Sequence, residues 1–221
     1  MIKELKIKEN LILFYVTIIT GLYPIFLTSD KISKLLNVTR TPAVALHYIL
    51  VFLFFFIIPS LIIKLYFKEN LKDYGLNFNN VKKGSIFISI LLPLLIISLW
   101  ISSKTAPFQK EYPLAKSIIN NYKLFIGMEF LYLLYYIGWE FLFRGFIING
   151  LKKYGILLPI LIETVISTIL HYTKPDGEIF LALIAGFILG YYAYKFKSIW
   201  FTIVIHFLTG ILMDIFVIIN R

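Results

Sequence analysis

The sequence predicts an all-α fold, a polytopic transmembrane helical bundle with about seven spans (seven to eight). Of its 221 residues, 59% are hydrophobic and 18% are aromatic, whereas soluble domains are about 45–50% apolar. The apolar residues also come in long runs rather than in amphipathic stripes, and runs of about 20 such residues are typical of helices that cross a bilayer. No internal repeat and no linker interrupts the pattern, so residues 1–221 are expected to form a single integral membrane domain.

Short polar stretches divide the chain into its predicted spans. In order, the spans are expected at about 10–28, 43–66, 84–101, 117–152, 156–171, 178–195 and 198–219. The turn "KKYG" precedes the fifth span, and the break "HYTKPDG", with Pro175 and Gly177 as helix breakers, follows it. The first apolar run lacks a small-residue cleavage site after it, so we interpret it as a retained span and not as a signal peptide.

The basic residues predict contact with lipid headgroups and not with nucleic acid. The net charge is +10, but the lysines lie mostly between apolar runs, where they flank spans and contact lipid headgroups, so we expect no nucleic-acid binding. Twelve Lys/Arg fall on the N-terminal side (3, 6, 8, 64, 68, 72, 82, 83, 152, 153, 195, 197) and nine on the other (31, 34, 40, 104, 110, 116, 123, 174, 221). This bias favours a cytoplasmic N-terminus. The abundance of Lys, Ile and Asn suggests a multi-pass protein of a bacterial cytoplasmic membrane. The chain has no cysteine, which excludes disulfides and thiolate chemistry.

Ionisable residues inside predicted spans are costly and usually functional. The candidates are Glu140, Arg144, His171, Glu178, His206 and Asp214, and Glu129 and Glu163 are further examples. In "WEFLFRG", Glu140 and Arg144 are four residues apart, so they share a helix face and can pair. Such a pair either joins two helices or forms part of a site.

Two histidines favour the second interpretation. His171 and His206 lie on different spans from Glu140, and neutral imidazole suits zinc, so these three residues are the predicted ligands of a Zn²⁺ ion. At about 1.5 Å per residue, Glu140 is about 20 Å and His171 about 24 Å from the turn that joins their helices. His206, only about 12 Å from its own turn, is expected to be shallower.

These residues, in this order, resemble the CPBP family of intramembrane metalloproteases, also called the Abi or CAAX-protease-like family. The family pattern is Glu-Glu-x-x-x-Arg, then Phe-x-x-x-His, then His-x-x-x-Asn or Asp on successive spans. "WEFLFRG" matches at Glu140 and Arg144, "STILH" at His171 and "HFLTG" at His206. The resemblance covers about residues 70–215.

Three positions depart from this pattern. Trp139 replaces the first glutamate, which activates water in the family, Ser167 replaces the phenylalanine, and Gly210 replaces the final Asn/Asp. We hypothesise that Glu178, which follows the "KPDG" break, supplies the missing carboxylate. Asp214, eight residues after His206, would stand in for the missing Asn/Asp.

The resemblance implies a metal-dependent intramembrane endopeptidase, whose Glu- and His-activated water cleaves a membrane-associated or lipidated peptide or protein. Two alternatives remain open. The loss of the first glutamate is compatible with a degenerate member that acts as a membrane scaffold or a bacteriocin-immunity-type protein. Intramembrane charges also occur in small-solute transporters, although the chain lacks the repeat that many transporters carry.

Overall fold

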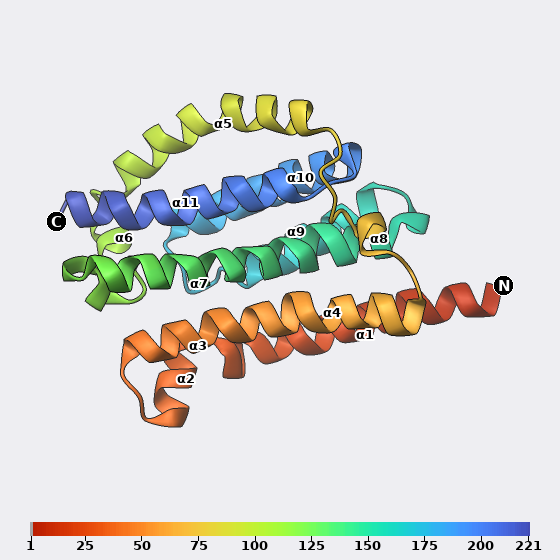
Figure 1. Cartoon of the computed structure of the whole chain (residues 1–221), viewed down its shortest axis with the longest axis horizontal. Helices are drawn as coiled ribbons and strands as arrows, with labels where there is room; N and C mark the ends of the chain where they lie inside the picture. Colours follow the sequence, from red (N-terminus) through yellow and green to blue (C-terminus); the bar gives the residue numbers. More distant parts are fainter. Residues whose placement is uncertain (1) are drawn as a thin grey trace.

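The computed structural model describes residues 2–221, with side chains from Ile7 onward, and within this range it contains helices and no strand (Figure 1). Met1 and the side chains of residues 2–6, which include two lysines of the predicted N-terminal basic segment, lie outside the described part. The elements are α1 (Ile2–Leu22), η1 (Tyr23–Leu27), α2 (Ser29–Leu36), α3 (Arg40–Phe52), η2 (Leu53–Ile57), α4 (Ile58–Leu61), η3 (Ile62–Phe67), η4 (Leu71–Tyr74), α5 (Val81–Ser102), α6 (Ala106–Glu111), η5 (Lys116–Asn120), α7 (Tyr122–Glu140), η6 (Phe141–Ile147), α8 (Ile148–Gly150), η7 (Lys152–Tyr154), α9 (Leu157–Ile169), α10 (Asp176–Phe196) and α11 (Trp200–Ile219).

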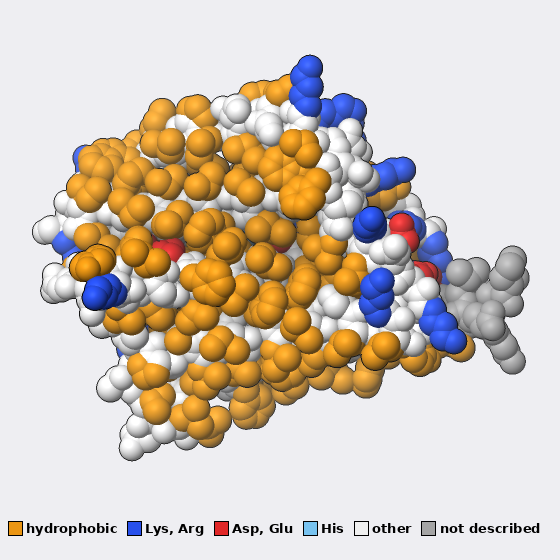
Figure 2. Space-filling view, in the orientation of Figure 1, with side chains coloured by type: hydrophobic (Ala, Val, Ile, Leu, Met, Phe, Trp, Pro, Cys, Tyr) orange, Lys and Arg blue, Asp and Glu red, His pale blue; other side chains and the backbone are white. Residues whose placement is uncertain are grey.

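Six helical stretches of the described chain are long and apolar enough to cross a membrane, which confirms the predicted polytopic bundle. They are Ile7–Leu27, Arg40–Phe67, Val81–Ser102, Tyr122–Gly150, Asp176–Phe196 and Trp200–Ile219. Hydrophobic side chains cover the face of the molecule seen in Figure 2, and Lys and Arg side chains lie toward its ends. This distribution is the one that a bilayer requires.

The predicted span at 156–171 is shorter than expected. Helix α9 has 13 residues, about 20 Å of helix, whereas the hydrocarbon core is about 30 Å thick. The helix stops because tight turns follow it: the backbone N–H groups of His171 and Tyr172 donate to Thr168 and Ile169, and that of Lys174 donates to His171. Irregular backbone at membrane depth is tolerated where it lines a cavity.

Helix α7 and its continuation η6 occupy the centre of the bundle. In the most apolar stretch of Tyr122–Gly150, 72% of the residues are buried inside the protein, whereas the corresponding value for Val81–Ser102 is 11%. Helix α5 is therefore peripheral and faces lipid. Figure 1 shows α7 between α10 and α11 on one side and α3 and α4 on the other. Every residue from Phe141 to Ile147, Arg144 included, is buried, as expected for a segment at the centre of the bundle with neighbouring helices around it.

The long helix predicted at 117–152 is not regular. Residues 116–120 form a separate 3₁₀ turn, and Asn121 caps the following helix by accepting a hydrogen bond from the N–H of Leu124 at 3.0 Å. Beyond Glu140 the backbone becomes π-helical over Phe141–Ile147. Short π-helical segments often mark functional sites, and this one begins between the two charges of "WEFLFRG".

Candidate active site

The structure brings Glu140 of α7 and His206 of α11 together. Nδ1 of His206 lies 2.6 Å from Oε1 of Glu140, whose side chain is fully buried. Because a carboxylate accepts, Nδ1 carries the proton and Nε2 is left with a free lone pair. The ring of Tyr136 packs on His206 with centroids 4.4 Å apart. The glutamate therefore fixes both the orientation and the tautomer of this histidine.

His171 is oriented in a similar way by the backbone. It lies in the turn after α9, and its Nδ1 is 2.7 Å from the carbonyl oxygen of Ser167. A carbonyl only accepts, so Nδ1 is again the donor and Nε2 is free. Trp139, at the position of the family's first glutamate, packs edge-to-face with His171, with ring centroids 5.3 Å apart and planes at 82°. An indole thus packs against this histidine, and Trp139 can supply no carboxylate to it.

Arg144 has two buried carboxylates as neighbours. Its Nε is 3.5 Å from Oε2 of Glu140 and 3.7 Å from Oε2 of Glu163 on α9, and none of the three side chains is more than 4% exposed. Nε and Nη1 of Arg144 have no hydrogen-bond partner among the described residues. Glu163 has room because it faces Gly190 of α10, where an added Cβ would come within 2.4 Å of Glu163 Oε1. The predicted Glu140–Arg144 pair is thus part of a larger charge cluster.

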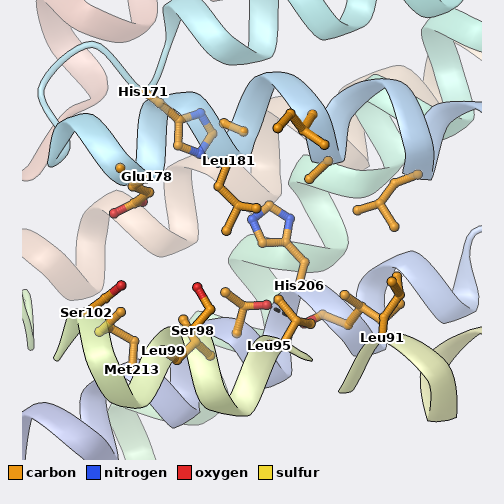
Figure 3. A pocket seen from close by; sticks show the side chains of 18 of the residues that line it. Leu91, Leu95, Ser98, Leu99, Ser102, His171, Glu178, Leu181, His206 and Met213 are labelled. Carbon is orange, nitrogen blue, oxygen red and sulfur yellow. Dashed lines mark hydrogen bonds between the residues drawn. The ribbon is translucent and has the colours of Figure 1, made fainter. Parts of the chain in front are cut away.

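A cavity of about 500 Å³ lies beside these groups, between α5, α7, α10 and α11. Helix α5 packs on α11 while α10 packs on α9, and the cavity lies between these two pairs. Most of its wall is apolar, including Leu91, Leu95, Leu181, Ile184 and Ile188, and its polar groups include Arg144, His171, Glu178 and His206. In Figure 3, His171 and Glu178 lie on the wall opposite Ser98 and Ser102, and His206 lies between them. Cavities of about 300–1,000 Å³ with few polar groups are typical ligand sites.

Glu178 lies in this wall and is held by Tyr112. The hydroxyl of Tyr112 donates to Glu178 Oε2 at 2.7 Å. Burial raises the pKa of Tyr112 well above its usual value, and the charge of Glu178 raises it further, so the hydroxyl keeps its proton. Burial acts to lower the pKa of Lys174, but Glu178 and Glu111 outweigh it and raise that pKa, so Lys174 is an ammonium at neutral pH. Nζ of Lys174 lies 2.8 Å from Glu111.

Asp214 does not join the site. It is buried but does not line the cavity, and its close polar neighbour is Glu129 of α7. Eight residues of helix separate it from His206, about 12 Å along α11. The prediction that Asp214 replaces the family's Asn/Asp is therefore not supported by its position.

The predicted zinc ligands do not form a zinc-binding set as they are placed. Among the described residues, no three His, Asp or Glu side chains come together in a way that could hold a metal ion. Oε1 of Glu140 accepts a hydrogen bond from His206, and Oε2 faces Arg144, so both oxygens already face another side chain. The Nε2 atoms of His171 and His206 remain, which are two ligands where protein zinc sites use three or four. Zinc binding at these residues stays a prediction from the sequence.

The fold and the site together define an integral membrane protein with a buried Glu–His pair at the wall of an apolar cavity. Residues 121–212 match the family described as type II CAAX prenyl endopeptidase Rce1-like. This match confirms the resemblance of these residues to the CAAX-protease-like family. No curated protein and no solved structure matches the chain significantly. The matched segment contains Glu140, Arg144, His171, Glu178 and His206 and ends before Asp214.

Gly210 offers a test of how tightly this site is packed. An added Cβ would lie 2.3 Å from the hydroxyl oxygen of Tyr136 and 2.8 Å from Cε1 of Tyr132, both buried. Gly210→Ala is therefore expected to lower the free energy of unfolding by about 1–3 kcal/mol, the usual cost of overpacking, and to lower activity by displacing Tyr136 from His206. Gly127→Ala, on α7 with nothing within 4 Å of its added Cβ, is the matched control and should be neutral or stabilising. Thermal unfolding in detergent measures both, and equal effects would contradict the packing argument.

Proposed function

We propose that this chain is an intramembrane endopeptidase that cleaves a membrane-associated or lipidated peptide or protein, with His206 as the general base. The observation that carries the proposal is the 2.6 Å hydrogen bond between Glu140 and His206, which leaves Nε2 of His206 available at the cavity. A histidine oriented by a buried carboxylate is a recurrent arrangement for general-base chemistry.

The reaction would be a hydrolysis in two proton transfers. Nε2 of His206 takes a proton from a water molecule while the water oxygen attacks the carbonyl carbon of the scissile peptide bond. The carbon–nitrogen bond then breaks as the imidazolium returns that proton to the leaving nitrogen. Glu140 stabilises the imidazolium between these steps, and the unpaired N–H groups of Arg144 are the donors best suited to the oxyanion. Glu178, held by Tyr112, is a further carboxylate in the wall of the cavity.

The shape and chemistry of the cavity support an apolar substrate group. Its volume is about 500 Å³, and its apolar walls on α5 and α10 can accommodate a lipid chain or several apolar side chains. Because α5 faces lipid over most of its length, we propose that the substrate comes from the bilayer. A cleavage assay with the protein in vesicles and a lipidated peptide, read by mass spectrometry, tests the proposal. We expect His206→Ala to abolish cleavage. The control is Ser98→Ala, which also changes a polar side chain in the cavity wall, and it should retain cleavage.

Trp139 favours one alternative, a family member without peptidase activity. Its side chain is 1% exposed and packs against His171, at the position where the family's water-activating glutamate is expected. A folded, monodisperse protein that cleaves no lipidated or unlipidated peptide would support this alternative, in which the cavity binds a partner in the membrane without cutting it.

Metal content separates two versions of the peptidase. The metal-free version, which the placement of the described side chains favours, predicts less than one zinc per chain in detergent-purified protein and cleavage that survives a chelator. His171→Ala/His206→Ala is the control for metal held at the site. About one zinc per chain, lost in this double variant, would contradict the metal-free version and restore the predicted zinc site.

A further inference from the structure

A second, smaller cavity adjoins the first one. Its volume is about 50 Å³, and we call it the polar chamber. His171, Glu178, His206 and four aromatic residues line both cavities, so they form the partition between them. On its other side, the polar chamber is lined by His47, Tyr23, Tyr48, Tyr135 and Lys174. All three histidines of the chain therefore border one small space.

His47 is built into this chamber. It lies on α3, its side chain is 5% exposed, and its Nδ1 is 2.5 Å from the carbonyl oxygen of Leu27. The carbonyl accepts, so Nδ1 is the donor and the free lone pair is on Nε2. The ring packs among Tyr23, Tyr48 and Tyr135, with centroids 5.8, 5.7 and 5.3 Å away. An imidazole acceptor and phenolic hydroxyls thus surround a space that apolar residues could have filled.

We propose that the polar chamber stores the water consumed in hydrolysis and supplies it through the partition to His206 and His171. This inference rests on the proposed peptidase function. A buried water needs about 10–15 Å³ and two to four polar partners, so 50 Å³ holds about three waters among the groups present. Substrate and water then reach the catalytic groups from opposite sides, the substrate from the apolar cavity and the water from the chamber.

The charges favour water over an anion as the occupant. Lys174 is the cation of the chamber, but its Nζ is 2.8 Å from Glu111, and Glu178 also lines the chamber. A cation that already faces two carboxylates leaves no surplus positive charge to bind a third. The apolar cavity, lined largely by leucine and isoleucine, offers few partners to water, so it is a poor store for it.

Hydroxyl-radical footprinting of the protein in detergent tests the chamber without requiring activity, because radicals formed at bound water label adjacent side chains. Tyr48 is 3% exposed and lines the chamber, and Tyr74 is 1% exposed and lines neither cavity. We expect Tyr48 to be labelled several-fold faster than Tyr74, and His47→Phe, which fills the chamber, to reduce that labelling to the level of Tyr74. Equal labelling of the two tyrosines in the unmodified protein would overturn the proposal.

Kinetics provide the second readout. His47→Phe is expected to lower kcat by about 10²-fold, as small misplacements of reacting groups can, and to leave KM unchanged, because the substrate cavity does not include His47. Tyr74→Phe, which also alters one buried aromatic side chain, should leave kcat unchanged. A labelled chamber in a protein that cleaves nothing would overturn the proposed function and keep the water site. A fully active His47→Phe would overturn the water supply alone.

Discussion

Glu140→Gln is expected to lower kcat by about 10³–10⁴-fold with little change in KM. The amide can donate to Nδ1 of His206, which would shift the imidazole proton to Nε2 and remove the lone pair that faces the cavity. Comparable loss follows when the carboxylate behind a catalytic histidine is replaced by its amide in serine proteases. The substitution keeps the size of the side chain, which is fully buried, so packing is little changed. Cleavage of a lipidated peptide in vesicles, with kcat and KM separated, measures the effect.

Glu129→Gln is the matched control for this experiment. Glu129 lies on the same helix α7 and is 5% exposed, but it neighbours Asp214 and lines neither cavity. It should change kcat less than threefold, a free-energy change below ~1 kcal/mol. If Glu140→Gln retained full activity, His206 would not be the base held by Glu140, and Glu178 would become the leading carboxylate. If both variants lost activity equally, the loss would reflect folding of α7 and not the chemistry.

The helical architecture could be predicted from the sequence because lipid imposes it. Long apolar runs leave a chain no other way to satisfy its backbone polar groups in a membrane, and six of the seven predicted spans are long enough to cross. The exception, α9, ends at Ile169, because the turns before Pro175 stop the helix. Apolar composition identifies a membrane segment without showing where its helix stops.

The site was predictable only in part. Glu140 and His206 were singled out because ionisable residues in spans are rare, and the structure joins them. Helix rise alone predicts that His206 is shallower than Glu140, whereas the two side chains meet, because helix tilt and the π-helical segment change their depths. Asp214 was assigned to the site from its spacing on one helix, but spacing says nothing of the neighbouring helix, which presents Glu129 to it.

The roles of two residues, His47 and Glu163, could not be predicted from the sequence, because their partners lie far away in it. His47 lacks any motif neighbour, and only the approach of α3 to α7 places it in the polar chamber. Glu163 gave a usable signal, as the lone charge of an apolar helix, but its partner Arg144 is 19 residues earlier and Gly190 opens the space for it from a third helix. Such contacts follow from helix packing, which periodicity does not encode.

Arg144→Met is expected to lower the free energy of unfolding by about 3–5 kcal/mol, the cost of removing one partner from a buried ion pair. The loss would leave Glu140 and Glu163, both fully buried, without their shared cation. If the instability arises from that uncompensated charge, the double variant Arg144→Met/Glu163→Gln should regain part of the lost free energy of unfolding. Glu163→Gln alone should not stabilise the protein, because it removes a partner of Arg144. Unfolding in a denaturing detergent, with all four proteins compared, measures the coupling.

Arg40→Met provides the contrast with an ion pair near the surface. Arg40 pairs with Asp30, and these side chains are 35% and 72% exposed, so its loss should cost about 0–1 kcal/mol. A loss of that size for Arg144→Met, with no recovery in the double variant, would mean that the buried carboxylates are already neutral and need no cation. The guanidinium would then be available to the substrate alone, and its effect would be confined to kcat. The stability measurement therefore decides whether Arg144 maintains the charge of Glu140 or acts only on the substrate.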